Sequence, residues 1–191
     1  MRYEKGHKEL SKARILDVAS RQFRKGGVAA VGLATVLSEA GLTNGAFYNH
    51  FESKDALVRD VLAVTMDQRR ENMLKAIESV GMEAAIRNYL SVTHRDNPES
   101  GCPSASLIPE IGRYPIETRE LYTMRIKSFI ELVASKFKHP DETTRHQQAT
   151  ALFALLVGTV QLARAVSDQA MSTSILEGGL RTALALLAEA T

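Results

Sequence analysis

Apolar residues recur at helical spacing along nearly the whole chain of 191 residues, and this periodicity constrains the fold more than any other feature. Ile15, Val18, Ala19 and Phe23 repeat every three or four positions, which puts them on one face of a helix. The alternation that marks a half-buried strand never persists, and β-branched residues are scattered. The sequence therefore predicts an all-α protein.

Glycine, proline and capping residues divide the chain into about nine helices. Ser11 and Ser53 are suited to cap helices, whereas Gly81 and Pro140 interrupt the pattern. The predicted helices cover residues 11–25, 33–40, 43–49, 54–79, 83–94, 104–112, 115–138, 142–167 and 172–190. Residues 97–103 are expected to form a loop.

Composition and charge narrow the class of protein. Hydrophobic residues make up 45% and charged residues 24% of the chain, as in a folded globular protein. The single cysteine, Cys102, excludes an intramolecular disulfide, and we recognise neither a secretory signal nor a membrane span, so we expect a cytoplasmic protein. The net charge is +2, but residues 1–25 carry eight Lys and Arg against three Asp and Glu. Such a basic helix suits DNA phosphates, although a solvated charged face is an equally ordinary interpretation.

Two short helices that meet at Gly41 make residues 33–51 the most informative segment. A sharp turn between helices needs a residue that tolerates positive φ, which glycine supplies at little cost. The apolar residues of this segment share an underside that can rest on the first helix; they are Leu33, Val36, Leu37, Ala40, Leu42 and Phe47. The sequence thus predicts a three-helix, helix-turn-helix domain over residues 1–53 that binds DNA, followed by a second helical domain over 54–191.

The start of the second short helix carries residues that are suited to reading bases. Thr43 and Asn44 lie where side chains reach base edges: an Asn amide pairs with adenine, and a Thr methyl contacts thymine. Gly45 allows close approach of the backbone to DNA. Thr43 is equally suited to capping the helix, and the two roles are compatible.

Residues one turn further along are suited to phosphate contacts. Tyr48, Asn49 and His50 carry polar tips, and Lys54 adds a cation near the N-terminus of the next helix. Packing alone is the alternative role for Tyr48.

The order and spacing of residues in this region resemble the DNA-binding domain of the TetR/AcrR family. The residues that carry the resemblance are Ile15-Leu16-Asp17-Val18-Ala19, Phe23, Gly26, Val36, Ala40-Gly41, Gly45, Phe47-Tyr48, His50-Phe51 and Ser53-Lys54-Asp55-Ala56-Leu57. The resemblance implies a homodimeric repressor that contacts two half-sites of an operator and has a C-terminal ligand-binding and dimerisation domain. It also implies that Tyr48, His50 and Lys54 meet phosphates, whereas Thr43, Asn44 and Gly45 face bases.

One position departs from the family's pattern. The first of the two short helices often begins with Ser or Thr in this family, but Val31 and Gly32 stand here. The hydroxyl cap, and the phosphate contact that it can make, are therefore missing. Thr35 is the nearest hydroxyl and becomes a candidate for phosphate contact.

The last two predicted helices, within about 142–190, have broad apolar surfaces and small residues such as Ala154 and Gly158. In the TetR family the final two helices pair with those of a second subunit in a four-helix bundle. We expect about half of these apolar residues to form that contact and the rest to form the subunit core. A two-fold dimer would match a palindromic operator.

The segment from Gly101 to Glu110 contains Gly101-Cys102-Pro103 and resembles an element of one TetR subset. Cys102 precedes a predicted helix, with His94 and Arg95 nearby in sequence, and both features favour a thiolate. The sequence therefore suggests a sensor of electrophiles or oxidants, against the commoner alternative of a buried structural cysteine.

An effector cavity is the other expectation for the C-terminal domain, and its mixed lining favours a hydrophobic or aromatic ligand. The candidate ligand-binding residues are Met66, Met73, Tyr89, His94, Cys102, Tyr122, Phe129 and Phe153. Most of them stand at helical core spacing, so core packing is the commoner role for each one taken alone. The identity of the effector is left open.

Two other classes of protein fit the sequence less well. An enzyme is disfavoured because we recognise no phosphate loop, metal-ligand spacing or nucleophile-base arrangement, and no cofactor or metal is expected. A structural helical adaptor would not need Thr43, Asn44 and Gly45 followed by Phe47 and Tyr48.

Overall fold

The computed structural model describes residues 3–190, without the side chains of residues 3–5, 44, 189 and 190. This part of the chain contains eight α-helices, two short 3-10 helices and no strand, so the all-α prediction is confirmed. The elements are α1 (Tyr3–Gly26), α2 (Leu33–Glu39), η1 (Asn44–Asn49), α3 (Lys54–Tyr89), α4 (Val92–Asp96), η2 (Pro98–Ser100), α5 (Pro103–Ile111), α6 (Ile116–Ala134), α7 (Glu142–Ala165) and α8 (Gln169–Ala190).

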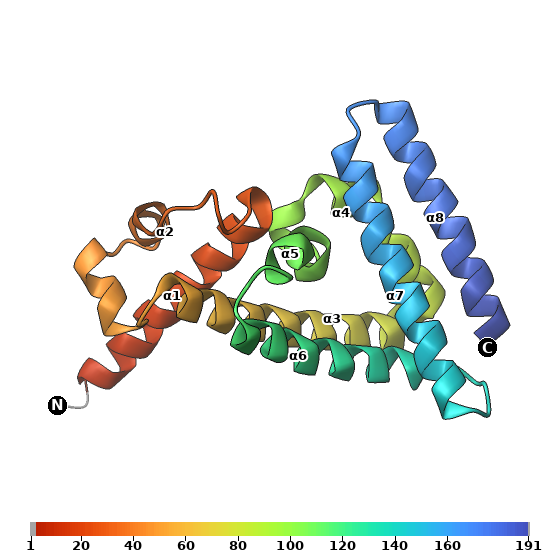
Figure 1. Cartoon of the computed structure of the whole chain (residues 1–191), viewed down its shortest axis with the longest axis horizontal. Coiled ribbons are helices and arrows are strands. Elements are labelled where there is room, and N and C mark those ends of the chain that lie inside the picture. Colours follow the sequence, from red (N-terminus) through yellow and green to blue (C-terminus); the bar gives the residue numbers. More distant parts are fainter. Residues whose placement is uncertain (1–2, 191) are drawn as a thin grey trace.

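The helices form two regions joined by α3 (Figure 1). At one end, α1, α2 and η1 make a small unit, which we call the head. The long α3 leaves the head and runs alongside α6, and α7 and α8 stand side by side at the opposite end (Figure 1). Helix α5 lies between these regions, in contact with both α1 and α7.

Two hydrophobic cores support this arrangement. The core of the head buries Ile15, Phe23 and Phe47 and extends into α5 through Leu107 and Ile111. The second core lies among α3, α5, α6, α7 and α8, and includes Phe129. Because α5 contributes to both cores, a movement of α5 must disturb the packing of the head as well.

Several predicted boundaries differ from the structure. Helix α1 extends back to Tyr3, so the predicted cap Ser11 is wrong: it lies buried inside the helix. Gly81 has φ 86° and kinks α3, which confirms the prediction that this glycine interrupts the helical pattern. The predicted helix over 83–94 is divided, because α3 ends at Tyr89 and the Ser91 hydroxyl caps the new helix α4 by accepting from the His94 amide. The 3-10 helix η2 occupies part of the predicted loop.

Helix α7 is long and apolar enough to cross a membrane by length and composition alone, with a mean hydropathy of 1.2 over 18 residues. In this structure it packs against α6 on one side and α8 on the other. Its buried residues, among them Leu152, Leu156 and Val160, belong to the second core. We therefore interpret α7 as a core helix.

Candidate functional site

The helix-turn-helix geometry predicted for the head is present. Helix α2 ends at Glu39, and Gly41 lies in the turn that follows, with a φ of 71° in the left-handed region that favours glycine. The next element is the 3-10 helix η1 instead of an α-helix, and Phe47 anchors it by burying its ring in the core of the head. Phe47 also stacks on Phe51, with ring centroids 5.5 Å apart.

Several of the predicted base-reading and phosphate-contacting residues form an exposed rim along residues 43–49. Thr43, Gly45 and Asn49 are exposed, and Tyr48 keeps 75% of its surface accessible. Backbone geometry places Asn44 at the first position of η1, but its side chain lies outside the described residues. A large aromatic ring left this exposed beside a buried one is available to a partner.

The start of α2 confirms the departure noted in the sequence. Gly32 occupies the N-cap position in an extended conformation, and it has no side chain with which to cap the helix. Thr35 is exposed one turn into α2, so its hydroxyl is accessible to a phosphate.

Lys54 has a structural role that sequence reasoning missed. Its Nζ donates to the carbonyl oxygens of Val28 and Val31, each at 2.7 Å, and so ties the α1–α2 loop to the start of α3. The Ser53 hydroxyl accepts from the amide of Ala56 at 3.1 Å, which confirms the predicted cap. An ammonium has three N–H donors, so one donor of Lys54 is left for a phosphate.

His50 lies half-buried at the end of η1, among cations. Burial first, and then the charges of Lys8 and Lys12, lower the pKa of His50. Its Nδ1 is buried without a hydrogen-bond partner among the described residues. An anion brought to this edge would favour the protonated ring.

Glu110 connects α5 to the head, which the sequence did not predict. Its carboxylate accepts from the amides of Val28 at 3.1 Å and Ala29 at 3.0 Å. Gly27, with φ 81°, allows this approach, because a Cβ there would lie 2.8 Å from a Glu110 oxygen. The α1–α2 loop is therefore held from two sides, by Lys54 and by Glu110.

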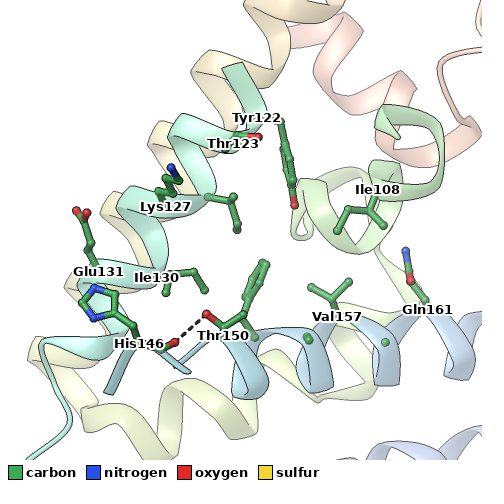
Figure 2. Close-up of a pocket in the computed structure, with 14 residues that line it drawn as sticks. Ile108, Tyr122, Thr123, Lys127, Ile130, Glu131, His146, Thr150, Val157 and Gln161 are labelled. Atoms are coloured by element: carbon green, nitrogen blue, oxygen red, sulfur yellow. Dashed lines mark hydrogen bonds between the residues drawn. The ribbon is translucent and has the colours of Figure 1, made fainter. Parts of the chain in front are cut away.

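A cavity of about 760 Å³ opens among α5, α6 and α7 (Figure 2). Its wall is mainly apolar, with Ile108 from α5, Ile126 and Ile130 from α6 and Val157 from α7. Figure 2 shows Lys127, Glu131 and His146 at one end and Gln161 toward the other. A cavity of this size and lining suits a small, largely apolar molecule with a polar group.

Tyr122 links the cavity wall to α5. Its hydroxyl lies 2.9 Å from the Ser104 hydroxyl, and burial raises the pKa of Tyr122 to about 12. Helix α5 therefore contacts the cavity directly through Ile108 and indirectly through Ser104, one turn earlier, which contacts the cavity-lining Tyr122.

Of the eight predicted ligand-binding residues, Tyr122 and Phe153 line this cavity. Met73 and Phe129 instead belong to the second core, beside a void of only about 20 Å³. Met66 is buried, with its sulfur 3.8 Å from the Ser104 hydroxyl. The sequence could place these residues on inward helix faces, but it could not show which faces leave space.

The other three predicted ligand-binding residues, Tyr89, His94 and Cys102, form a cluster outside this cavity. The His94 ring donates from Nδ1 to the Tyr89 carbonyl (2.6 Å) and accepts at Nε2 from the Cys102 amide (2.9 Å). Burial is the main cause that lowers the pKa of His94 to about 4. The Cys102 side chain is 1% exposed, so an electrophile would need an opening of the structure to reach the thiol.

Arg164 of α7, which sequence reasoning did not single out, holds this region together. Its guanidinium donates to the carbonyl oxygens of His94 at 2.7 Å and Arg95 at 2.9 Å, and to the Ser106 hydroxyl at 3.2 Å. It therefore joins α7 to α4 and α5.

Sequence comparison supports the assignment of the head. Residues 15–61 match the family model described as "Bacterial regulatory proteins, tetR family". The transcriptional regulator TtgR of Pseudomonas putida is 35% identical over 79 residues, which cover 41% of this chain and 37% of that protein. An uncharacterised regulator of Mycobacterium tuberculosis, MT1294, is 34% identical over 110 residues, covering 54% of each chain. The matches thus span about half or less of these relatives' length.

Solved structures share the fold over nearly the whole chain. The reduced form of Escherichia coli NemR superposes with a TM-score of 0.73 at 21% identity, covering 93% of this chain and 97% of that one. A TetR-family regulator from Cytophaga hutchinsonii gives a TM-score of 0.75 at 17% identity, covering 94% and 96%. Residues 15–61 therefore match the DNA-binding domain of the TetR family of bacterial regulatory proteins, and the chain as a whole shares the fold of the solved structures.

Proposed function

We propose that this protein is a cytoplasmic transcriptional repressor that binds a palindromic operator as a homodimer and leaves it when a small effector occupies the α5–α6–α7 cavity. The observation that carries the proposal is the course of α5. Ile108 on this helix lines the cavity, and Glu110, two residues later, binds the head. One short helix thus connects the effector site with the DNA-binding unit.

Operator binding is assigned to the exposed rim of η1. Thr43, Asn44 and Gly45 face bases, whereas Tyr48, Asn49, His50, Lys54 and Thr35 contact phosphates. The exposure of Tyr48 and the remaining donor of Lys54 support these roles. The charges of Lys8 and Lys12 beside His50 add a positive edge to the rim.

Dimerisation is assigned to α7 and α8. A stripe of exposed apolar residues runs along α7 through Ala151, Ala154, Gly158 and Leu162, and Leu162 is 53% exposed. On α8, Met171 is 54% exposed. Small residues permit close approach of helices, and a two-fold contact would set the two heads against half-sites about 34–36 Å apart.

Release follows from the contacts of α5. An effector that presses on Ile108 or Tyr122 displaces α5, and Glu110 then draws the α1–α2 loop with it. Because Lys54 ties the same loop to the start of α3, the displacement reaches α3 as well, and the spacing of the two heads changes. A change of a few ångströms is enough to prevent simultaneous contact with both half-sites.

The effector is a small molecule that is apolar over most of its length, with a polar group near Lys127, Glu131 and His146. The buried position of Cys102 favours this non-covalent ligand over an electrophile.

The test begins with an operator selected from genomic DNA and an effector found by thermal stabilisation of the protein. Ile126→Trp fills the cavity, so this variant should bind the operator but no longer be released by the effector. Met124→Trp, on the exposed face of the same helix, is the matched control and should respond like the wild type. Release of Ile126→Trp at wild-type effector concentrations would refute the cavity assignment.

Dimerisation is tested with Leu162→Glu, which places a charge in the exposed stripe of α7. Sedimentation should show monomers, and operator affinity should fall with them. Val80→Glu introduces the same charge at another exposed apolar position, near the kink of α3, and should leave the dimer intact. Dimers of Leu162→Glu would contradict this interface.

A further inference from the structure

Three arginines gather in a second cavity, at the junction between the head and the C-terminal helices. This cavity of about 270 Å³ is lined by Arg21 and Arg24 from α1 and by Arg69 from α3. It shares no lining residue with the larger cavity among α5, α6 and α7. The carboxylates of Asp17 and Glu99 also line it, which leaves one net positive charge on its wall.

The three guanidinium groups differ in how many of their N–H donors have a hydrogen-bond or ion-pair partner. Arg21 forms ion pairs with Asp17 at 3.2 Å and Glu39 at 3.5 Å. Arg24 donates from Nε to the Glu99 carbonyl oxygen at 2.8 Å, which leaves its terminal nitrogens available.

Arg69 is the unusual member of the group. Its guanidinium lies 5.1 Å over the ring of Tyr89, and within residues 3–190 it has neither an ion-pair partner nor a hydrogen bond. Its Nε is buried without an acceptor. A guanidinium that lines a cavity without a partner keeps its charge there uncompensated, so an anion that pairs with it gains a charge-assisted contact.

We propose that this cavity binds a small organic or inorganic anion through a carboxylate or phosphate group. Planar guanidinium groups bind both groups in bidentate fashion, and the unpaired charge of Arg69 supplies the attraction. The amides of Gln68 and Asn72 on α3 line the same space and can hold the polar remainder of the ligand. The volume limits the ligand to a molecule much smaller than the effector of the other cavity.

The position of this cavity gives the anion a regulatory consequence. A ligand shared by Arg24 of α1 and Arg69 of α3 joins the head to the long helix that carries it. Binding there stabilises one orientation of the head, and it does so independently of the effector cavity.

The experiment measures anion binding without DNA, so its outcome is independent of the proposed repressor function. Inorganic phosphate and succinate are titrated by calorimetry at constant ionic strength, with chloride as the reference salt. Saturable binding of either anion is expected. The affinity should fall about tenfold in Arg69→Gln, the loss expected for one charge-assisted hydrogen bond, and should not change in Arg87→Gln, an exposed arginine elsewhere on α3.

Changes at Asn72 test the sign of the electrostatic effect without removing the contact of Arg69 with Tyr89. Asn72→Asp should weaken anion binding, and Asn72→Lys should strengthen it, a reversal that misfolding cannot produce. Binding of phosphate alone or of succinate alone supports the proposal and identifies the group. It is overturned if neither anion binds more than chloride does, or if Arg69→Gln and both Asn72 variants bind like the wild type.

Discussion

The head and the C-terminal helices differ in how their functional side chains are brought together. The rim of the head comes from residues 43–49, a single short turn that is fixed by Gly41 and Phe47. The proposed effector cavity draws its wall from three helices between Ile108 and Gln161. A local site can be placed from the order of residues alone, whereas a cavity depends on how distant helices pack. Perturbation of the two regions should therefore have different consequences.

The largest expected effect distinguishes a buried packing residue of the head, Phe47, from its exposed neighbour, Tyr48. Phe47→Ala removes a ring that is 1% exposed and should destabilise the protein by about 3–5 kcal/mol. Tyr48→Ala removes the exposed neighbour and should change stability by less than about 0.5 kcal/mol, but should weaken operator binding by about tenfold. Urea unfolding and fluorescence anisotropy measure the two effects. Equal destabilisation by both substitutions would contradict the division of roles in η1.

The second effect belongs to the C-terminal helices and is a dependence of stability on pH. The pKa of His94 is about 4 in the folded protein, against 6.5 for an ordinary histidine. The contribution of neutral His94 to the free energy of unfolding is therefore fully present above pH 6.5. It is lost as the pH falls from 6.5 toward 4, by up to about 3 kcal/mol.

Urea unfolding across this pH range measures the loss, and His94→Asn should flatten the profile. A matched substitution outside the cluster, His139→Gln, should preserve it. A flat profile in the wild-type protein would show that His94 titrates normally.

A smaller effect should appear where the two regions meet. Glu110→Gln removes the negative charge that accepts from two backbone amides and should cost about 1–2 kcal/mol. The variant should still bind effector, as measured by calorimetry, but the effector should release it from the operator less completely. Glu117→Gln, an exposed carboxylate at the start of α6, should behave as the wild type. If the effector released Glu110→Gln completely from the operator, the coupling between the cavity and the head would not depend on Glu110.

The smallest effect concerns His50. Its pKa is lowered in the free protein, and a phosphate beside it would raise that pKa. Operator binding should therefore take up protons. The affinity for the operator should increase a few-fold as the pH falls below the pKa of an ordinary histidine. Anisotropy titrations at several pH values measure this slope, and His50→Gln should abolish it. The same slope in His50→Gln would assign the proton uptake to another group.

The sequence predicted the head well because its features are local. Gly41 specifies the turn, Ser53 caps the next helix, and apolar spacing places Phe47 beneath the rim. Ser11 was wrongly predicted as a helix cap because serine is a common capping residue. The sequence did not show that the residues before Ser11 are already helical. The phosphate contact of Lys54 stays a prediction, and its bonds to Val28 and Val31 depend on a loop that the sequence could not position.

The lining of the cavity was predicted only in part because it depends on how distant helices pack. Tyr122, Phe129 and Phe153 all stand at inward positions, yet only Tyr122 and Phe153 reach the open space. Helical spacing shows which face points inward, but the distance between facing helices decides whether that face packs or lines a cavity. Glu110 was missed because its partners lie more than 80 positions away.

The central claim is that occupation of the cavity is transmitted through α5 and Glu110 to the head. Hydrogen exchange of the Val28 and Ala29 amides tests it most directly, because these two amides donate to the Glu110 carboxylate. With effector bound, both amides should exchange faster, while the amides of the α6 residues that line the cavity exchange more slowly. Release from the operator with unchanged exchange at Val28 and Ala29 would contradict the account.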